Sequence, residues 1–248
     1  PRWTRGLVAR AASIGLRTLT GRFDAVIAAT PVIARKLERA GTPIGVVRNF
    51  CLDEEMDPRT EAPDQPNGDG RFVYVGGLSV DRGLTTMLSA MEHVEFPCEL
   101  DLAGSGDERV LKELRASPKI RWRGVLPKAA IPAMLRGATA GLCVLQRRRN
   151  YEESLPTKIF EYLAAGIPVI ASDFPYWREL LAGFDCAVFV PPEDSKALVA
   201  AMRSLLIDQE RWLRMAKEAR RAAESFRWSS ELRELVRVYE RLGAGTNP

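Results

Sequence analysis

A repeated alternation of short apolar runs and longer amphipathic stretches constrains the fold of this chain most strongly. Strand-like runs are expected at residues 72–75, 98–103, 120–122, 141–145, 169–171 and 187–190. Helices are expected to begin after each of them, at Leu84, Glu108, Ala130, Pro156, Trp177 and Ser195. Strands that alternate with helices build a parallel sheet covered by helices on both faces. The pattern therefore predicts an α/β, Rossmann-like, doubly wound domain, followed by two further helices at residues 211–224 and 229–242.

Residues 1–52 carry a smaller pattern of the same kind. A strand is expected at residues 25–29, a helix at 31–39 with Thr30 as N-cap and Pro31 in its first turn, and a strand at 44–47. The short loops favour a parallel pair, but so small a piece cannot complete a core. We therefore expect a partial second α/β lobe, the end of a larger domain. Residues 53–70 are acidic and rich in Pro and Gly, which is typical of a linker.

Composition limits the classes of partner. The net charge of +4 and pI near 9.0 fit anionic ligands or acidic membrane surfaces, but the excess is too small to indicate nucleic acid. No apolar run reaches the roughly 18 residues that span a bilayer. Residues 2–22 predict a basic helix, for which packing on a sheet is favoured over contact with acidic lipids. Because the first residue is Pro, we expect a processed chain or a fragment.

The cysteines and the single histidine argue against a metal site. Cys51, Cys98, Cys143 and Cys186 are widely spaced without a C-x-x-C pair, so buried free thiols and a reduced, cytoplasmic setting are expected. They supply no zinc-ligand cluster. His93 falls at the end of an expected helix, with no nucleophile beside it in the sequence, and is not a catalytic candidate.

Two glutamates, Glu153 and Glu161, bracket the start of an expected helix. Pro156 suits its first turn, and the backbone N–H groups that follow make an anion site. Eight residues correspond to about 800° of helical rotation, about 80° off a whole number of turns, so Glu153 is expected in the loop before the helix. A ligand with a negative centre and hydroxyls on both sides fits this arrangement, as a nucleotide-sugar does.

A glycine pair, Gly76 and Gly77, links the expected strand at 72–75 to a helix, with Arg82 at the helix start. Glycines at the carboxyl end of a strand let the backbone approach a phosphate closely. The spacing is not G-x-G-x-x-G, which disfavours a dinucleotide. Gly104 ends the next strand and is expected at the same edge of the sheet. For the basic run at residues 147–151, a solvated loop is favoured over a site for a second anion such as an acceptor phosphate.

These motifs together resemble the family 4 retaining glycosyltransferases with the GT-B fold. The resemblance implies that Glu153 lies near the donor hexose and Glu161 holds the ribose hydroxyls. It implies that Arg82 faces the diphosphate. Lys158, inside the glutamate motif and near the helix start, would add positive charge at the phosphates, with a solvent-exposed lysine as the alternative. The chain departs from the family pattern because Gly77 replaces a basic residue that is frequent there, and because Arg82 stands where Lys is common. Further donor contacts are implied at Gly76, Gly77, Gly104, Val125, Leu155, Pro156 and Thr157.

The resemblance also implies an organisation and an activity. Residues 1–52 would end an acceptor-side lobe, residues 71–225 would bind the donor, and residues 226–248 would return to the first lobe. The implied reaction moves a hexose from a nucleoside-diphosphate sugar to a saccharide or lipid-linked acceptor, without a metal or other cofactor, in bacterial cell-surface polysaccharide synthesis. Contact with the inner face of the membrane stays open, and so does activity of the chain by itself. A nucleotide-sugar epimerase and a non-catalytic sugar-nucleotide-binding module are the alternatives.

Overall fold

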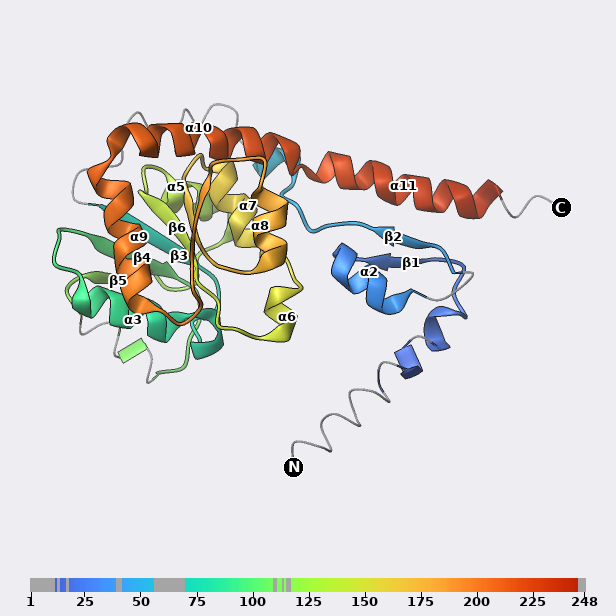
Figure 1. Cartoon of the computed structure of the whole chain (residues 1–248), viewed down its shortest axis with the longest axis horizontal. Helices are drawn as coiled ribbons and strands as arrows, with labels where there is room; N and C mark the ends of the chain where they lie inside the picture. Colours follow the sequence, from blue (N-terminus) through green and yellow to red (C-terminus); the bar gives the residue numbers. More distant parts are fainter. Residues whose placement is uncertain are drawn as a thin grey trace. The chain divides into compact units, whose positions relative to one another are not determined.

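The computed structural model describes residues 12, 14–16, 18–38, 42–55, 70–108, 111, 112, 114 and 117–244. The chain divides into two compact units, whose elements are labelled in Figure 1. Unit 1 consists of Pro1–Phe50, Glu153–Leu155 and Arg227–Pro248, and unit 2 of Cys51–Glu152 and Pro156–Phe226. Of the basic helix expected at residues 2–22, residues 12, 14–16 and 18–20 are helical and residues 21–22 form a turn. Residues 2–11, 13 and 17 lie outside the described residues, as do residues 56–69 of the linker.

Unit 2 contains a six-stranded sheet in the order β5-β4-β3-β6-β7-β8, in which all neighbouring strands pair in parallel. The strands are β3 (Arg71–Val75), β4 (Glu99–Ala103), β5 (Ile120–Trp122), β6 (Ala140–Cys143), β7 (Val169–Ser172) and β8 (Ala187–Val190). The chain winds outward in one direction from β3 and in the other from β6. The expected doubly wound α/β fold is confirmed, with its switch point between β3 and β6.

Helices cover both faces of this sheet (Figure 1). They are α3 (Leu84–His93), α5 (Ile131–Leu135), α6 (Arg149–Glu152), α7 (Thr157–Ala164), α8 (Pro175–Leu181), α9 (Ser195–Ile207) and α10 (Gln209–Ser225). Short 3-10 turns are η1 (Asp53–Glu55), η2 (Val80–Arg82) and η3 (Lys128–Ala130). In the helix expected from Glu108, residues 108, 111, 112 and 114 are helical and the remainder lie outside the described residues.

The main core lies between the sheet and helices α3 and α9, which pack against each other. Phe72, Tyr74, Leu100 and Leu102 point from β3 and β4 into this layer. Burying such side chains supplies most of the free energy of folding. Helix α10 packs against both α9 and α7. Helix α7 is therefore held between its strands and a long neighbouring helix.

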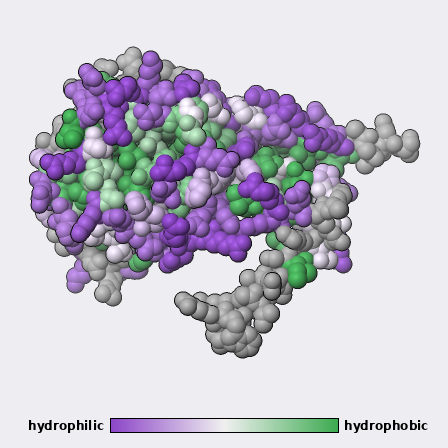
Figure 2. All heavy atoms as spheres, in the orientation of Figure 1, coloured by the Kyte–Doolittle hydropathy of each residue, from purple (hydrophilic) through white to green (hydrophobic). Residues whose placement is uncertain are grey.

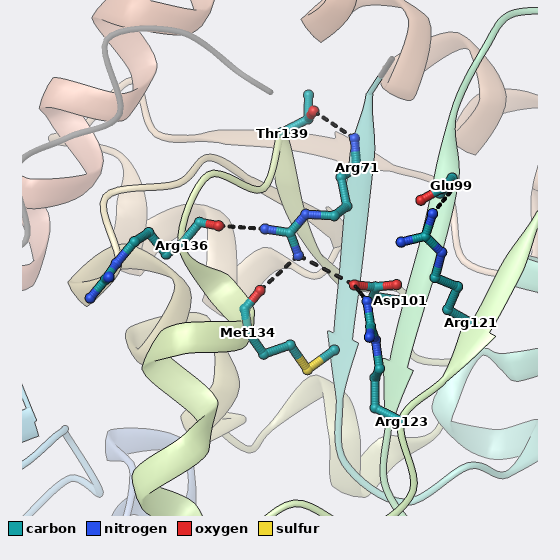
Figure 3. Close-up of polar contacts among 8 residues, drawn as sticks. All are labelled: Arg71, Glu99, Asp101, Arg121, Arg123, Met134, Arg136 and Thr139. Atoms are coloured by element: carbon teal, nitrogen blue, oxygen red, sulfur yellow. Dashed lines mark hydrogen bonds and ion pairs between the residues drawn. The ribbon is translucent and has the colours of Figure 1, made fainter. Parts of the chain in front are cut away.

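A buried carboxylate, Asp101, ties three strands together (Figure 3). It is 1% exposed and accepts hydrogen bonds from the Arg71 and Arg123 guanidinium groups at 3.4 and 3.0 Å. Arg71 also donates to the carbonyl oxygens of Met134, at 2.7 Å, and Arg136, which end α5. Paired and hydrogen-bonded in this way, the charge is tolerated inside the domain. The network fixes the relative positions of β3, β4 and the loop after β5.

Unit 1 contains a two-stranded parallel sheet of β1 (Val26–Ala28) and β2 (Ile44–Val46), connected by α2 (Pro31–Leu37). The expected cap is confirmed, because the Ile33 N–H donates to Thr30 Oγ1 at 3.2 Å and Pro31 occupies the first helical position. Helix α11 (Trp228–Ala244) belongs to the same unit. It packs against β2, where a Cβ added to Gly45 would lie 2.6 Å from Val238 Cγ2.

In the basic run at residues 147–151, residues 147–150 are exposed to solvent as expected, but residues 149–152 form the short helix α6 instead of a loop. Two arginines of the run are ion-paired. Arg147 pairs with Glu152 at 3.1 Å, and Arg148 pairs with Asp81 at 2.8 Å. These pairs use guanidinium groups that a second anion would need, so the run is better understood as a local structural element.

The four cysteines are buried free thiols, as expected. Burial raises the pKa of Cys98 to about 11 and the pKa values of Cys143 and Cys186 to about 12. His93 is exposed at the end of α3, with Nδ1 2.7 Å from the Ser89 carbonyl oxygen.

Hydrophilic side chains cover most of the described surface that Figure 2 shows. Within the described residues, no helix has the length and apolar character needed to cross a membrane. The same residues contain no group of three or more His, Cys, Asp or Glu side chains suited to a metal ion.

Candidate functional site

Three loops meet at the carboxyl edge of the sheet, where the sequence places Gly76, Gly104 and Gly124. The Gly76 N–H donates to the Ala103 carbonyl oxygen at 2.8 Å, which extends β3–β4 pairing into the loops. The Gly104 N–H donates to the Gly124 carbonyl oxygen, also at 2.8 Å. Ligands of doubly wound sheets bind at this edge, next to the switch point. Gly76 and Gly104 lie at the same edge of the sheet, as the sequence predicts, and Gly124 joins them there.

Gly76 and Gly104 adopt backbone conformations that L side chains rarely enter, with φ of +137° and +147°. A Cβ on Gly104 would lie 1.8 Å from the Gly76 carbonyl oxygen, so the two loops pack backbone against backbone. A Cβ on Gly76 would lie 2.9 Å from Lys158 Nζ. The absence of a side chain at Gly104 therefore permits the close packing of the two loops, and its absence at Gly76 leaves room for the lysine ammonium beside the backbone.

Lys158 is a buried cation rather than a solvent lysine. Lys158 is 6% exposed, and its Nζ has no hydrogen-bond partner among the described residues. The Nζ lies 3.6 Å from the centroid of the Tyr74 ring. Burial lowers the pKa of Lys158 to about 8, with Cys143 and Glu161 acting in the opposite direction and Arg82 adding to the decrease. An unpartnered buried ammonium is costly for a protein, which points to an anionic ligand.

The position of α7 aims Lys158 at the glycine loop. Tyr162 lies one turn further along α7, on the same face of the helix. Its hydroxyl accepts from the Val75 N–H at 3.1 Å and donates to the Leu142 carbonyl oxygen at 3.3 Å, so it spans β3 and β6 at the switch point. A Cβ on Gly141 would overlap its ring, at 2.2 Å. Tyr162 thus fixes the helix that carries Lys158.

Arg82 brings a second cation to the glycine pair. It ends η2, and its side chain runs along Gly77, where an added Cβ would lie 3.6 Å from the Arg82 Cδ and Nε. The residue is exposed to solvent. Arg82 depresses the pKa of Lys158, which means that the two positive charges act on each other. The expected juxtaposition of Arg82, Lys158 and the glycine pair is present.

Helix α7 begins one residue later than expected. Pro156 is its N-cap, with φ of −70° and ψ of 123°, and Thr157 is the first helical residue. The N-terminal N–H groups of a helix lack carbonyl partners within the helix. The start of α7 therefore offers N–H groups and a positive dipole end beside the Lys158 cation.

Glu161 follows Lys158 by three residues on α7, close to one helical turn. It lines a cavity of about 560 Å³ together with Ala164 of α7, its C-cap Ala165, and Lys128 and Leu135 of η3 and α5. The negative charge of Glu161 attracts the Lys158 ammonium and so raises the pKa of Lys158. The carboxylate thus stands next to the cationic group and also borders a roomy, largely apolar cavity.

Glu153 and Leu155 are assigned to unit 1. Glu153 lies in the turn before α7, where helix geometry placed it. Its carboxylate is ion-paired with Lys36 of α2, and its carbonyl oxygen accepts from Thr30 Oγ1 at 3.0 Å. Contact of Glu153 or Leu155 with a donor stays a prediction.

The loop after β5 presents its backbone. Gly124 has φ of +73°, and Val125 is 72% exposed. The Trp122 indole donates to the Gly104 carbonyl oxygen at 3.0 Å and so links this loop to the next. Contact of Val125 with a base stays a prediction.

Sequence reasoning missed Tyr74 and Tyr162. Tyr74 is fully buried, and its hydroxyl donates to the Gly77 carbonyl oxygen at 2.8 Å. The available signal was a tyrosine two residues before a glycine pair, near the end of a strand. Buried tyrosines need a partner for the hydroxyl, and a loop backbone is the nearest candidate.

Comparison with known proteins identifies the family. Residues 57–222 match the family model described as "Glycosyl transferases group 1". The chain belongs to the group 1 glycosyltransferases. Among curated relatives, it is 31% identical over 215 residues to the phosphatidyl-myo-inositol mannosyltransferase of Mycobacterium leprae, covering 83% of this chain and 55% of that protein. It is 26% identical over 233 residues to the glycogen synthase of Mycobacterium tuberculosis H37Rv, covering 89% and 50%.

Solved structures show the same fold as this group 1 chain. The sucrose-phosphate synthase from Thermosynechococcus elongatus matches with a TM-score of 0.78 at 18% identity, over 96% of this chain and 63% of that one. Anabaena HepE in complex with UDP and glucose matches with a TM-score of 0.70 at 16% identity, over 92% and 67%. The fold is that of GT-B glycosyltransferases. The chain spans about half the length of the curated relatives it matches.

Proposed function

We propose that this group 1 chain is the donor-binding part of a retaining glycosyltransferase that moves a hexose from a nucleoside-diphosphate sugar to an acceptor hydroxyl. The observation that carries the proposal is the buried Lys158 ammonium, which has no hydrogen-bond partner among the described residues and lies beside the Gly76 backbone. A diphosphate supplies the negative charge that this arrangement lacks. Family membership and a neighbour whose structure contains UDP and glucose support the same class of ligand.

The cationic groups would act on the leaving group. As the glycosidic bond breaks, negative charge grows on the diphosphate, and preorganised donors at that position lower the barrier. Lys158, Arg82 and the N-terminus of α7 supply fixed positive charge there without a metal ion. Arg82 offers a planar fork of donors that suits phosphate oxygens.

The carboxylates would orient the donor as the family 4 resemblance implies. Glu161 would accept hydrogen bonds from the ribose hydroxyls, with the base placed toward Gly104 and Val125. Glu153 would accept from the hexose. The named mannosyl- and glucan-synthesising relatives support a hexose donor. A saccharide or lipid-linked acceptor, a role in bacterial cell-surface polysaccharide synthesis and a cytoplasmic location with peripheral membrane contact complete the proposal.

Nucleotide binding provides the first test. We expect one of UDP, GDP, dTDP and ADP to raise the melting temperature of the chain, because a ligand that binds the folded state stabilises it by mass action. Lys158→Met should abolish that increase, and Lys217→Met, at an exposed position of α10, should retain it. Absence of any shift with all four diphosphates at millimolar concentration would refute the proposed function.

Substitutions of the two glutamates should affect different measured properties, namely diphosphate affinity for Glu161 and sugar transfer for Glu153. Glu161→Ala is expected to weaken binding of the nucleoside diphosphate about tenfold, the equivalent of one lost charged hydrogen-bonding group at about 1.4 kcal/mol. Glu153→Ala should leave diphosphate affinity unchanged and impair sugar transfer by the complete protein. Calorimetry on both variants, with the diphosphate and with the sugar nucleotide, measures the difference. Unchanged diphosphate affinity in Glu161→Ala would show that the ribose assignment is wrong.

A further inference from the structure

Tyr74 contacts two separate parts of the site. Its hydroxyl donates to the Gly77 carbonyl oxygen at 2.8 Å, and its ring centroid lies 3.6 Å from Lys158 Nζ. The same hydroxyl would lie 3.4 Å from a Cβ on Gly76. Tyr74 is completely buried in the core between the sheet and helices α3 and α9, so its ring has little freedom to move. One rigid side chain therefore links the glycine loop to the lysine of α7.

We propose that Tyr74 is a positioning residue, whose ring holds the Lys158 ammonium against Gly76 and whose hydroxyl fixes the glycine loop. A lysine side chain has four methylene groups and loses considerable conformational entropy when it is held in one place. The face of an aromatic ring attracts a cation and does so more strongly where water is excluded. The ring thus replaces the hydrogen-bond acceptors that Lys158 lacks, without neutralising its charge.

The groups around Lys158 leave this charge available to a ligand. Burial raises the pKa of Tyr74 far above its usual range, so the phenol stays neutral and keeps its proton for Gly77. Cys143 is also neutral, because burial raises its pKa to about 12. Arg82 repels the ammonium and Glu161 attracts it. A carboxylate in place of the ring would form an ion pair and compete with a diphosphate, whereas the ring does not.

The two contacts of Tyr74 can be separated by substitution. Tyr74→Phe removes the hydroxyl and keeps the ring, while Tyr74→Met retains much of the volume but offers no π face. In wild-type protein with ¹³C-labelled lysine, the Lys158 Hε signals should be displaced upfield by the ring current, and Lys158→Met identifies them by their loss. The displacement should persist in Tyr74→Phe and vanish in Tyr74→Met. Unshifted Hε signals in the wild type would overturn the positioning role, even if Tyr74→Met failed to fold.

The consequence for binding rests on the proposed function. The probe is whichever of UDP, GDP, dTDP or ADP gives the largest thermal shift. Wild-type affinity should fall as the pH rises through about 8, where Lys158 loses its proton. Without the ring the ammonium is less stable, so in Tyr74→Met this fall should begin at lower pH, with about tenfold weaker binding at pH 8, whereas Tyr74→Phe should keep the wild-type profile.

The two proposals fail differently. If no diphosphate binds the wild type, the proposed function is wrong, and the ring-current measurement alone decides whether Tyr74 positions Lys158. If a diphosphate binds and the profile of Tyr74→Met coincides with that of Tyr74→Phe, the ring has no effect on the lysine and the inference is wrong. Circular dichroism of both variants confirms that each is folded before the profiles are compared.

Discussion

Lys158 lowers the stability of the unliganded domain. Its pKa is about 8 in the folded protein and 10.5 in the unfolded chain, so the unfolded chain binds the proton more tightly. The contribution of this group to stability is therefore most unfavourable below pH 8 and becomes less so as the pH rises toward 10.5. A residue retained at such a cost is typical of a binding site, where charge is needed for a ligand and not for the fold.

Replacing this lysine should stabilise the protein. Lys158→Met is expected to raise the free energy of unfolding at pH 7 by about 1–3 kcal/mol, because an apolar side chain fits the buried position without the desolvation of a charge. Urea denaturation at pH 7 and pH 10 measures the gain, which should shrink at the higher pH. Lys217→Met is the control and should change stability by less than about 0.5 kcal/mol. A loss of stability in Lys158→Met would mean that the ammonium is satisfied in the folded state.

At the scale of single residues, sequence reasoning succeeded where the cause is local. Thr30 was identified as an N-cap because capping depends on neighbouring residues in the chain. The burial of Lys158 was not predictable in this way, since it results from the packing of α7 onto strands β3 and β6. Tyr74 was overlooked for the same reason. Its two contacts form only when the glycine loop and α7 come together.

At the scale of elements, the glycine loops determine the shape of the site. Gly104→Ala should distort it, because the new Cβ would lie 1.8 Å from the Gly76 carbonyl oxygen and φ is +147°. We expect about 1–3 kcal/mol of lost stability from backbone strain alone, together with weaker diphosphate binding. Gly77→Ala is the control for stability, since its Cβ would meet Arg82 at an ordinary 3.6 Å. Equal melting temperatures for the two variants would contradict the close loop packing.

Sequence periodicity predicted most strands and helices of unit 2 to within a few residues. Helix α3 begins at Leu84 and β8 covers residues 187–190, as expected. The expected doubly wound arrangement rested on the repeated strand–helix alternation, whereas the order of the strands was not predicted from the sequence. Helix α6 was missed because its four residues are too few to show a period. The ion pairs of Arg147 and Arg148 beside it join positions that local sequence does not relate.

At the scale of the whole molecule, unit 1 is assembled from three separate stretches of the chain. Local patterns identified α2 and α11 as helices but did not relate them to each other. That α11 belongs with the N-terminal piece was suggested by the family resemblance. In the structure, a buried carboxylate of α11 bonds to the N-terminal piece. Glu231 is 4% exposed and accepts hydrogen bonds from the Arg48 backbone N–H at 2.6 Å and from the Arg48 guanidinium at 3.2 Å.

Glu231 should therefore be important for the stability of unit 1. Glu231→Gln removes the charge and replaces an acceptor by an amide, so the Arg48 guanidinium loses its ion pair in a buried place. We expect a loss of about 1–3 kcal/mol in the free energy of unfolding, measured by urea denaturation. Glu234→Gln is the matched control on the same helix, because Glu234 pairs with Arg237 at the exposed surface, where such pairs contribute less than about 1 kcal/mol. Similar losses in both variants would show that Glu231 does not hold α11 to the segment after β2.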